Sequence, residues 1–272
     1  MTSQTQTKRF QLTSSNYHSI EANKDYMSVS QFKGFIECEA KEMAKLNGAY
    51  IEPQSNALLV GSYLHAAFEN DEIFKVFQEE NNKAIYKARG GKYSDFETAD
   101  SMIETLKTDP FAMFAIEGEK EQIYTADLFG AAWKVKVDSI HHERRTFSDL
   151  KTTQDLHKRY WSVKYDGWVS FIEAWDYVLQ MALYRRVIQE NTGYTYSPYI
   201  VAVTKESPPN KAVVHFDESR FDFEYEYIEM KMERINEVKQ RIKEPIRCEK
   251  CRYCRESRKI KDTIEVGDLI HE

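Results

Sequence analysis

The sequence predicts a domain in which α-helices surround a β-sheet, because strand-like and helix-like hydrophobic patterns alternate along the chain. Between Glu119 and Lys151, three short runs of apolar or alternating residues are separated by turn signals and indicate antiparallel strands. Two further apolar runs indicate strands later in the chain. The five predicted strands cover residues 122–126, 132–140, 146–150, 196–204 and 212–216.

Apolar residues at helical spacing predict the helices around these strands. Ser28 or Ser30 caps the first helix, Asn47-Gly48 ends it, and Pro245 stops the last one. The other predicted helices cover residues 57–80, 98–107, 110–117 and 168–189, followed by a long helix that runs to residue 243. Residues 12–23 are expected to be irregular, and residues 82–97 to form a loop.

The bulk composition favours one large domain. The 272 residues can bury a sizeable core, and they contain no internal repeat, no long apolar run and no signal peptide. We therefore expect a single domain over residues 1–272, with an N-terminal extension at 1–25 and a C-terminal segment at 245–272. A cytoplasmic location without a membrane partner is expected. The net charge of −6 argues against a protein that coats nucleic acid, but allows an enzyme with a local basic groove.

The third predicted strand carries the charged triplet Asp149-Leu150-Lys151. Strand periodicity places Asp149 and Lys151 on one face and Leu150 on the other, and Asp138 lies near the end of the preceding strand. A hard divalent cation would explain this arrangement, with Asp138, Asp149 and the Leu150 carbonyl as oxygen ligands and Lys151 beside the metal. Alternating charge also occurs by chance on surface strands, so the triplet alone is weak evidence.

A polar segment after Lys151 interleaves basic and aromatic residues, namely Lys158, Arg159, Tyr160, Trp161, Lys164 and Tyr165. Such a mixture beside a metal site suits the backbone and bases of a nucleic acid. A solvated loop with a few buried rings explains the segment equally well.

Five features, in order along the chain, resemble the RecB-type branch of the PD-(D/E)XK nuclease superfamily, and especially phage and prophage RecE-type exonucleases (exodeoxyribonuclease VIII). The resemblance extends from about Ser28 to Cys254. The matching residues are Gly61 and His65 in a helical G-x-x-x-H, Glu121 (or Glu119) on the first strand, Asp138 on the second, Asp149-Leu150-Lys151 as D-x-K, and Gln180 and Tyr184 in Q-x-x-x-Y. No proline precedes Asp138, which is a small departure from the family pattern.

The resemblance implies an α/β fold of the PD-(D/E)XK restriction-endonuclease type, with a central mixed sheet flanked by helices. It implies a metal-dependent exonuclease acting on linear DNA in phage-type recombination or repair, with one or two Mg²⁺ or Mn²⁺ ions. The implied ligands are His65, Glu121, Asp138, Asp149 and the Leu150 carbonyl. Lys151 would act in catalysis, and Gln180 and Tyr184 would position DNA or support the site. A RecT-type annealing protein and a homo-oligomer are further expected partners.

The four cysteines form a separate pattern. Cys248, Cys251 and Cys254 have C-x2-C-x2-C spacing, and Cys38 lies more than two hundred residues earlier. Several RecB-type nucleases, including the AddB family, use cysteines in this way, so the resemblance implies a [4Fe–4S] cluster that joins the two ends of the domain. A zinc ion held by the same thiolates is the second interpretation, and two disulfides are the third.

Two other functions fit parts of the sequence. A nuclease that trims DNA for CRISPR adaptation fits the iron–sulfur pattern equally. A catalytically inactive nuclease fold that only binds DNA is the other alternative, but a binding module has no need to keep Asp138, Asp149 and Lys151 together.

Overall fold

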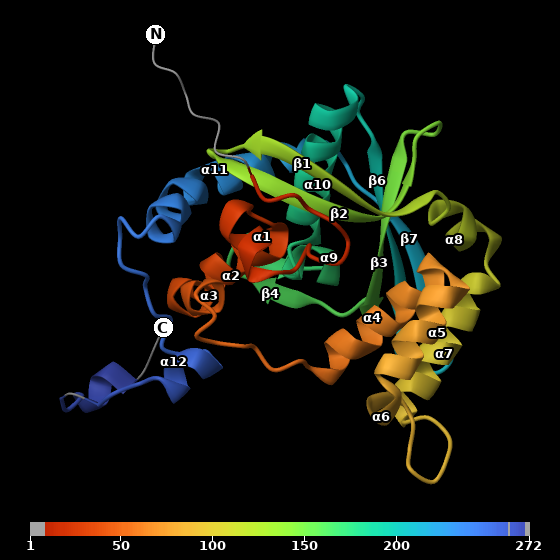
Figure 1. The fold of residues 1–272 in the computed structure, drawn as a ribbon, viewed down its shortest axis with the longest axis horizontal. Coiled ribbons are helices and arrows are strands. Elements are labelled where there is room, and N and C mark those ends of the chain that lie inside the picture. Colours follow the sequence, from red (N-terminus) through yellow and green to blue (C-terminus); the bar gives the residue numbers. More distant parts are fainter. Residues whose placement is uncertain (1–8, 261, 270–272) are drawn as a thin grey trace.

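The computed structural model describes residues 9–260 and 262–269. Its centre is a five-stranded sheet of order β1-β2-β3-β6-β7 (Figure 1). The strands are β1 (Glu119–Leu128), β2 (Ala131–His141), β3 (Thr146–Thr153), β6 (Ser197–Thr204) and β7 (Lys211–His215). β3 and β6 are parallel, whereas the other neighbouring pairs are antiparallel. The predicted α/β class, the mixed sheet and its five strands are thereby confirmed.

Helices cover both faces of this sheet (Figure 1). One face packs against α2 (Val29–Glu37), α10 (Tyr177–Thr192) and α11 (Ser219–Lys239). The other face packs against α4 (Asn56–Glu69), α7 (Ser94–Lys107) and α8 (Pro110–Ala115). The side chains alternate accordingly on the neighbouring strands: Phe147, Ile200 and Ala202 enter the first core, and Leu150, Val201 and Val203 the second.

Two predicted helices are each interrupted by a residue in an extended conformation. The helix predicted after Ser28 is split into α2 and α3 (Glu39–Leu46), because Cys38 ends the first and caps the second. The helix predicted at 57–80 is split into α4 and α5 (Asp71–Glu80), because the Asn70 side chain accepts a hydrogen bond from the Ile73 N–H. Such capping acceptors compete with continuation of the helix.

The helix predicted at 168–189 begins only at Tyr177. The residues before it form β5 (Gly167–Val169) and the short α9 (Phe171–Ala174), and left-handed Asp176 separates α9 from α10. β5 pairs with β4 (Tyr160–Ser162), so the polar segment after Lys151 contains a hairpin.

Three smaller differences concern segment ends. The stretch expected to be irregular includes the start of α1 (Ile20–Asp25), which is capped by Ser19. The loop expected at 82–97 contains α6 (Asn82–Ile85) and the start of α7. The long helix α11 ends at Lys239, four residues before the predicted end. The remaining elements are α12 (Arg252–Glu256) and a 3₁₀ turn, Val266–Leu269.

The single-domain boundaries stay a prediction. Residues 1–8 of the predicted N-terminal extension, and residues 261 and 270–272 of the C-terminal segment, lie outside the described residues. Within residues 9–260 and 262–269, no helix combines the length and the apolar character needed to span a membrane.

Candidate active site

The candidate site lies where β2 and β3 separate. Their paired register ends at Ser139 and Ser148, so Asp138 and Asp149, which would form the next pair, lie just beyond it. The Leu150 N–H donates to Asp138 Oδ2 at 2.9 Å instead of to a backbone carbonyl of β2. Because the backbone pairing of β2 and β3 ends here, there is space beside the two carboxylates. Continued strand pairing would fill this space.

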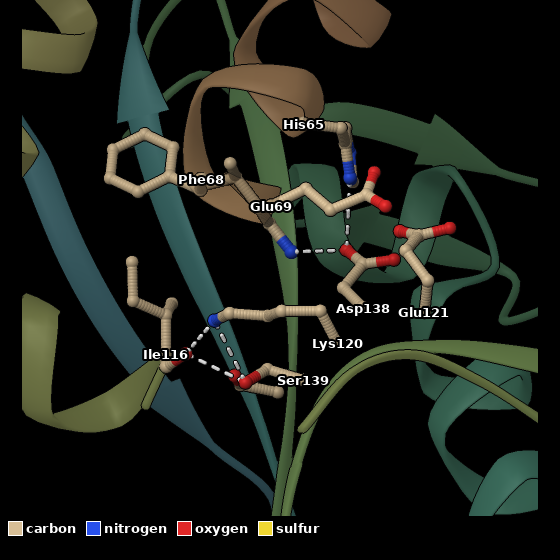
Figure 2. Close-up of a pocket in the computed structure, with 10 residues that line it drawn as sticks. His65, Phe68, Glu69, Ile116, Lys120, Glu121, Asp138 and Ser139 are labelled. Carbon is tan, nitrogen blue, oxygen red and sulfur yellow. Dashed lines mark hydrogen bonds and ion pairs between the residues drawn. The ribbon is translucent and has the colours of Figure 1, made fainter. Parts of the chain in front are cut away.

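Three of the predicted metal ligands converge at this point (Figure 2). His65 comes from α4, Glu121 from β1 and Asp138 from β2, and one ligand atom of each lies within 4.8 Å of the other two. His65 Nδ1 is 3.2 Å from Asp138 Oδ2. Two carboxylates and an imidazole in this arrangement are a donor set suited to a divalent cation.

Glu121, rather than Glu119, is the glutamate that reaches this cluster. Glu121, the third residue of β1, has a φ of 54°, a conformation that non-glycine residues rarely adopt. Its carboxylate contacts the ammonium group of Lys136 on the neighbouring strand. The Glu119 carboxylate instead lies 3.9 Å from His142 Nε2, outside the cluster.

The Asp149 side chain points toward α10, and it is not among the three residues whose ligand atoms lie within 4.8 Å of one another. Gln180 Nε2 donates to Asp149 Oδ1 at 2.5 Å, and the Lys151 ammonium contacts Oδ2, which has no hydrogen-bond partner otherwise. The Asp149 side chain is only 3% exposed. Burial alone would lower the pKa of Lys151, but the charges of Asp149 and Asp138 raise it above its usual value. Lys151 is therefore a protonated ammonium group beside the predicted metal site.

Five of the predicted site residues also share a cleft of about 470 Å³. Its lining includes Asp138, Asp149, Lys151, Gln180 and Tyr184, so both members of the Q-x-x-x-Y pattern face it. Burial raises the pKa of the Tyr184 hydroxyl well above its usual value, which keeps it neutral.

Glu69 was not predicted from the sequence. It lies one helical turn after His65 on α4, and its carboxylate points toward that of Glu121 (Figure 2). The i, i+4 spacing from His65 is the signal that could have identified it. Burial raises the pKa of Glu69, and the charge of Glu121 raises it further.

The acidic residues repel one another in the absence of a cation. Burial raises the pKa of Asp138 to about 6, and the nearby charge of Asp149 contributes to the same shift. A bound divalent cation would offset this repulsion, so the residues present fit the predicted magnesium or manganese site.

The four cysteines lie together beside α3 and α12, at the end of the chain shown in blue in Figure 1. All are free thiols, and their four sulfur atoms lie within 4.8 Å of one another. The Sγ atom of Cys254 is 3.6 Å from that of Cys38 and 4.0 Å from that of Cys248. The prediction that remote Cys38 joins the C-terminal cysteines is confirmed.

These separations suit a shared metal. Four thiolates at about 2.3 Å from one tetrahedral zinc ion lie about 3.8 Å apart, whereas a [4Fe–4S] cluster spreads its four thiolates farther apart. The two sulfur separations of 3.6 and 4.0 Å are close to the spacing around a single ion, and all four thiols are near enough to bind one metal group jointly.

Comparisons with known proteins agree with this fold. Residues 28–257 match the family model of a "PDDEXK-like domain of unknown function (DUF3799)". The crystal structure of a "putative exonuclease" from Eubacterium rectale is similar, with a TM-score of 0.91 and 36% identity over 96% of this chain and 98% of that chain. A second solved structure, that of SSO0001, is 12% identical over 75% of this chain and 95% of its own, with a TM-score of 0.27.

None of the curated proteins compared with the chain matches it. The matches support the predicted superfamily but do not single out its RecE-type members. The matched range spans both β-sheet aspartates, the helix bearing His65 and all four cysteines. The chain therefore belongs to the DUF3799 family of PDDEXK-like domains, within the PD-(D/E)XK nuclease superfamily.

Proposed function

We propose that the protein is a divalent-metal-dependent exonuclease that hydrolyses the phosphodiester bonds of linear DNA. The observation that carries the proposal is the convergence of His65, Glu121 and Asp138 where β2 and β3 separate, next to the Asp149–Lys151 pair. The similarity to the Eubacterium rectale "putative exonuclease" supports it.

His65, Glu121 and Asp138 would hold Mg²⁺ or Mn²⁺, with Asp149 and the Leu150 carbonyl as further ligands. The metal would activate a bound water and neutralise charge on the phosphate. Lys151 would orient the attacking water or stabilise the charge that develops on the phosphate oxygens. Gln180 is a positioning residue, because its hydrogen bond fixes the Asp149 carboxylate.

The test is a time course with Mg²⁺ on three DNA substrates: end-labelled linear duplex, covalently closed duplex circles and single-stranded DNA. An exonuclease should degrade the linear duplex and leave the circles intact for the same period. Equal cleavage of circles would contradict the requirement for a free end. A lack of cleavage with either Mg²⁺ or Mn²⁺ would favour the inactive DNA-binding fold.

We propose that the four cysteines hold zinc in place of the iron–sulfur cluster, because their sulfur atoms are as close as tetrahedral zinc requires. This assignment also weakens the CRISPR-adaptation alternative, whose main support was the iron–sulfur pattern.

A role in phage-type recombination or repair rests on the RecE-type resemblance. An exonuclease that leaves a single-stranded tail would supply the substrate of a RecT-type annealing protein, which is the proposed partner. A cytoplasmic location and a homo-oligomer belong to the same proposal.

A further inference from the structure

Two tryptophans stand exposed on the β4–β5 hairpin. Trp161 and Trp168 are directly opposite each other in the register, with ring centroids 5.8 Å apart. They are 56% and 64% exposed. Large rings held in solvent cost free energy unless another molecule covers them, so the pair marks an interaction surface.

The hairpin that carries these rings is firmly anchored. Lys164 Nζ lies 2.5 Å from Glu224 and 2.8 Å from Asp176, and the Tyr165 hydroxyl donates to Glu224. The Glu224 side chain, on α11, is fully buried. Lys164 and Tyr165, which the sequence placed among the candidate DNA contacts, therefore anchor the hairpin and fix the position of the exposed rings.

On the opposite face of the hairpin from the Trp161–Trp168 pair, aromatic and basic side chains lead from Tyr160 to the candidate site. The Tyr160 ring lies 5.8 Å from that of Trp175, which is 52% exposed, and β4 lies beside α9 (Figure 1). Lys33 Nζ donates to the Trp175 carbonyl at 2.6 Å. The Lys33 and Lys151 ammonium groups lie 5.4 Å and 4.9 Å from the centroid of the same Tyr177 ring.

Positive charge lies directly beside the exposed rings. The Arg159 guanidinium is 5.8 Å from the Trp168 ring, and Lys158 Nζ is 5.4 Å from the Tyr160 ring. Over the ranges 9–260 and 262–269, neither cation forms an ion pair. Both remain available for phosphate groups, although the molecule is acidic overall.

Resting on the proposed nuclease function, we propose that this hairpin, together with Trp175, is a platform for single-stranded DNA. The bases would stack on Trp161 and Trp168 with Arg159 at the phosphates beside them, and Trp175, Lys158 and Lys33 would contact the strand where it continues along the other face of the hairpin toward the site. Stacked aromatic side chains beside cations are typical of single-strand binding. A single strand is favoured over duplex because only unpaired bases offer free faces to the rings.

The test compares the binding of a fluorescent dT20 oligonucleotide with that of a blunt 20-base-pair duplex, both in Ca²⁺ to limit cleavage. The double variant Trp161→Ala/Trp168→Ala should bind dT20 at least tenfold more weakly, since it loses both rings on which bases would stack. Its affinity for the duplex should change less than twofold. Val163→Ala is the matched control, because Val163 is an exposed apolar residue of the same hairpin and has no ring.

Unchanged binding of dT20 would overturn the platform, and an equal loss for duplex and single strand would overturn its specificity for unpaired DNA. Hydrolysis of bis(p-nitrophenyl) phosphate with Mn²⁺ distinguishes this proposal from the catalytic one. The double variant and the unmodified protein should cleave this small diester at the same rate, because it does not reach the hairpin. If neither the double variant nor the unmodified protein cleaves the diester, the result counts against the nuclease function, and the binding comparison still tests the platform.

Discussion

The surroundings of Lys151 keep its amino group positively charged. The carboxylates of Asp149, which is buried, and Asp138, which is half-buried, hold its pKa high, and the ammonium group contacts Asp149 in the lining of the cleft. Asp149 is in turn fixed by Gln180. The three side chains form a unit in which one positive charge is held in place before a phosphate arrives, which is the arrangement that stabilises developing negative charge.

Lys151→Ala should therefore separate chemistry from binding. Loss of one fixed charge of this kind should reduce single-turnover cleavage by about 10²–10³-fold. Binding of linear DNA in Ca²⁺ should change only a few-fold, because the carboxylates remain. Glu119→Gln is the matched control, since this exposed carboxylate lies outside the cluster, and it should cleave normally. Full cleavage by Lys151→Ala would remove Asp149-Leu150-Lys151 as the catalytic signature.

The raised pKa of Asp138 makes the folding stability of the metal-free protein depend on pH. Its pKa rises from 3.8 to about 6 on folding, so the folded state binds more protons than the unfolded state between these values. Protonated Asp138 therefore adds to the free energy of unfolding at low pH, and this contribution is lost as the pH rises from about 4 to about 6. A divalent cation should restore it above pH 6, where Asp138 is ionised.

Asp138→Asn tests this linkage by thermal unfolding. Without metal at pH 7.5, the variant should be about 2–4 °C more stable than the unmodified protein for each kcal/mol of repulsion removed. Ca²⁺ should stabilise the unmodified protein at pH 7.5, much less at pH 5, and the variant at neither pH. A variant that Ca²⁺ stabilises as strongly as the unmodified protein would show that Asp138 does not hold the metal.

Among the elements, the strands were predictable because their signals are local. Short apolar or alternating runs and turn residues identify β1 to β3 from the sequence, and period-2 alternation correctly separated Leu150 from Asp149. The family resemblance favoured Glu121 over Glu119, but the hydrophobic pattern alone could not make this choice, because it depends on the left-handed backbone at Glu121. That conformation arises within the folded sheet and leaves no mark on the hydrophobic pattern.

The helix interruptions were missed for a related reason. Cys38, Asn70 and Asp176 stand inside segments whose apolar residues keep helical spacing, so periodicity alone continues the helix through them. Each break has a structural consequence. Cys38 can turn its thiol toward the other cysteines, and Asp176 pairs with Lys164 to anchor the β4–β5 hairpin.

Over the whole molecule, the cysteine cluster joins the two ends of the fold. Ionic and backbone contacts strengthen the same junction. Arg234 donates two hydrogen bonds to the Glu39 carboxylate, at 3.0 and 2.8 Å. The Ile246 N–H donates to Glu39 at 2.7 Å, and the Ala40 N–H donates to the Ile246 carbonyl at 3.0 Å. The junction should therefore weaken, rather than vanish, when a metal ligand is removed.

Sequence spacing identified the four cysteines but could not decide which ion they hold. Three cysteines at C-x2-C-x2-C spacing suit either cofactor, and the decision depends on the distance from Cys38 to the others. That distance is set by where α3 packs against the C-terminal segment, which no local pattern encodes.

Protein purified without oxygen should consequently be colourless and contain one zinc ion per chain, measured by elemental analysis. Cys38→Ser should lose the zinc and lower the melting temperature by about 5 °C or more, because binding of a structural metal contributes directly to folding. Limited proteolysis should then cut within residues 247–257. Glu39→Gln is the control for the junction itself, and it should lower the melting temperature but keep the zinc, since Glu39 contributes no sulfur. Brown protein with about four irons per chain would instead restore the iron–sulfur cluster and require the thiolates to lie farther apart than 3.6–4.0 Å.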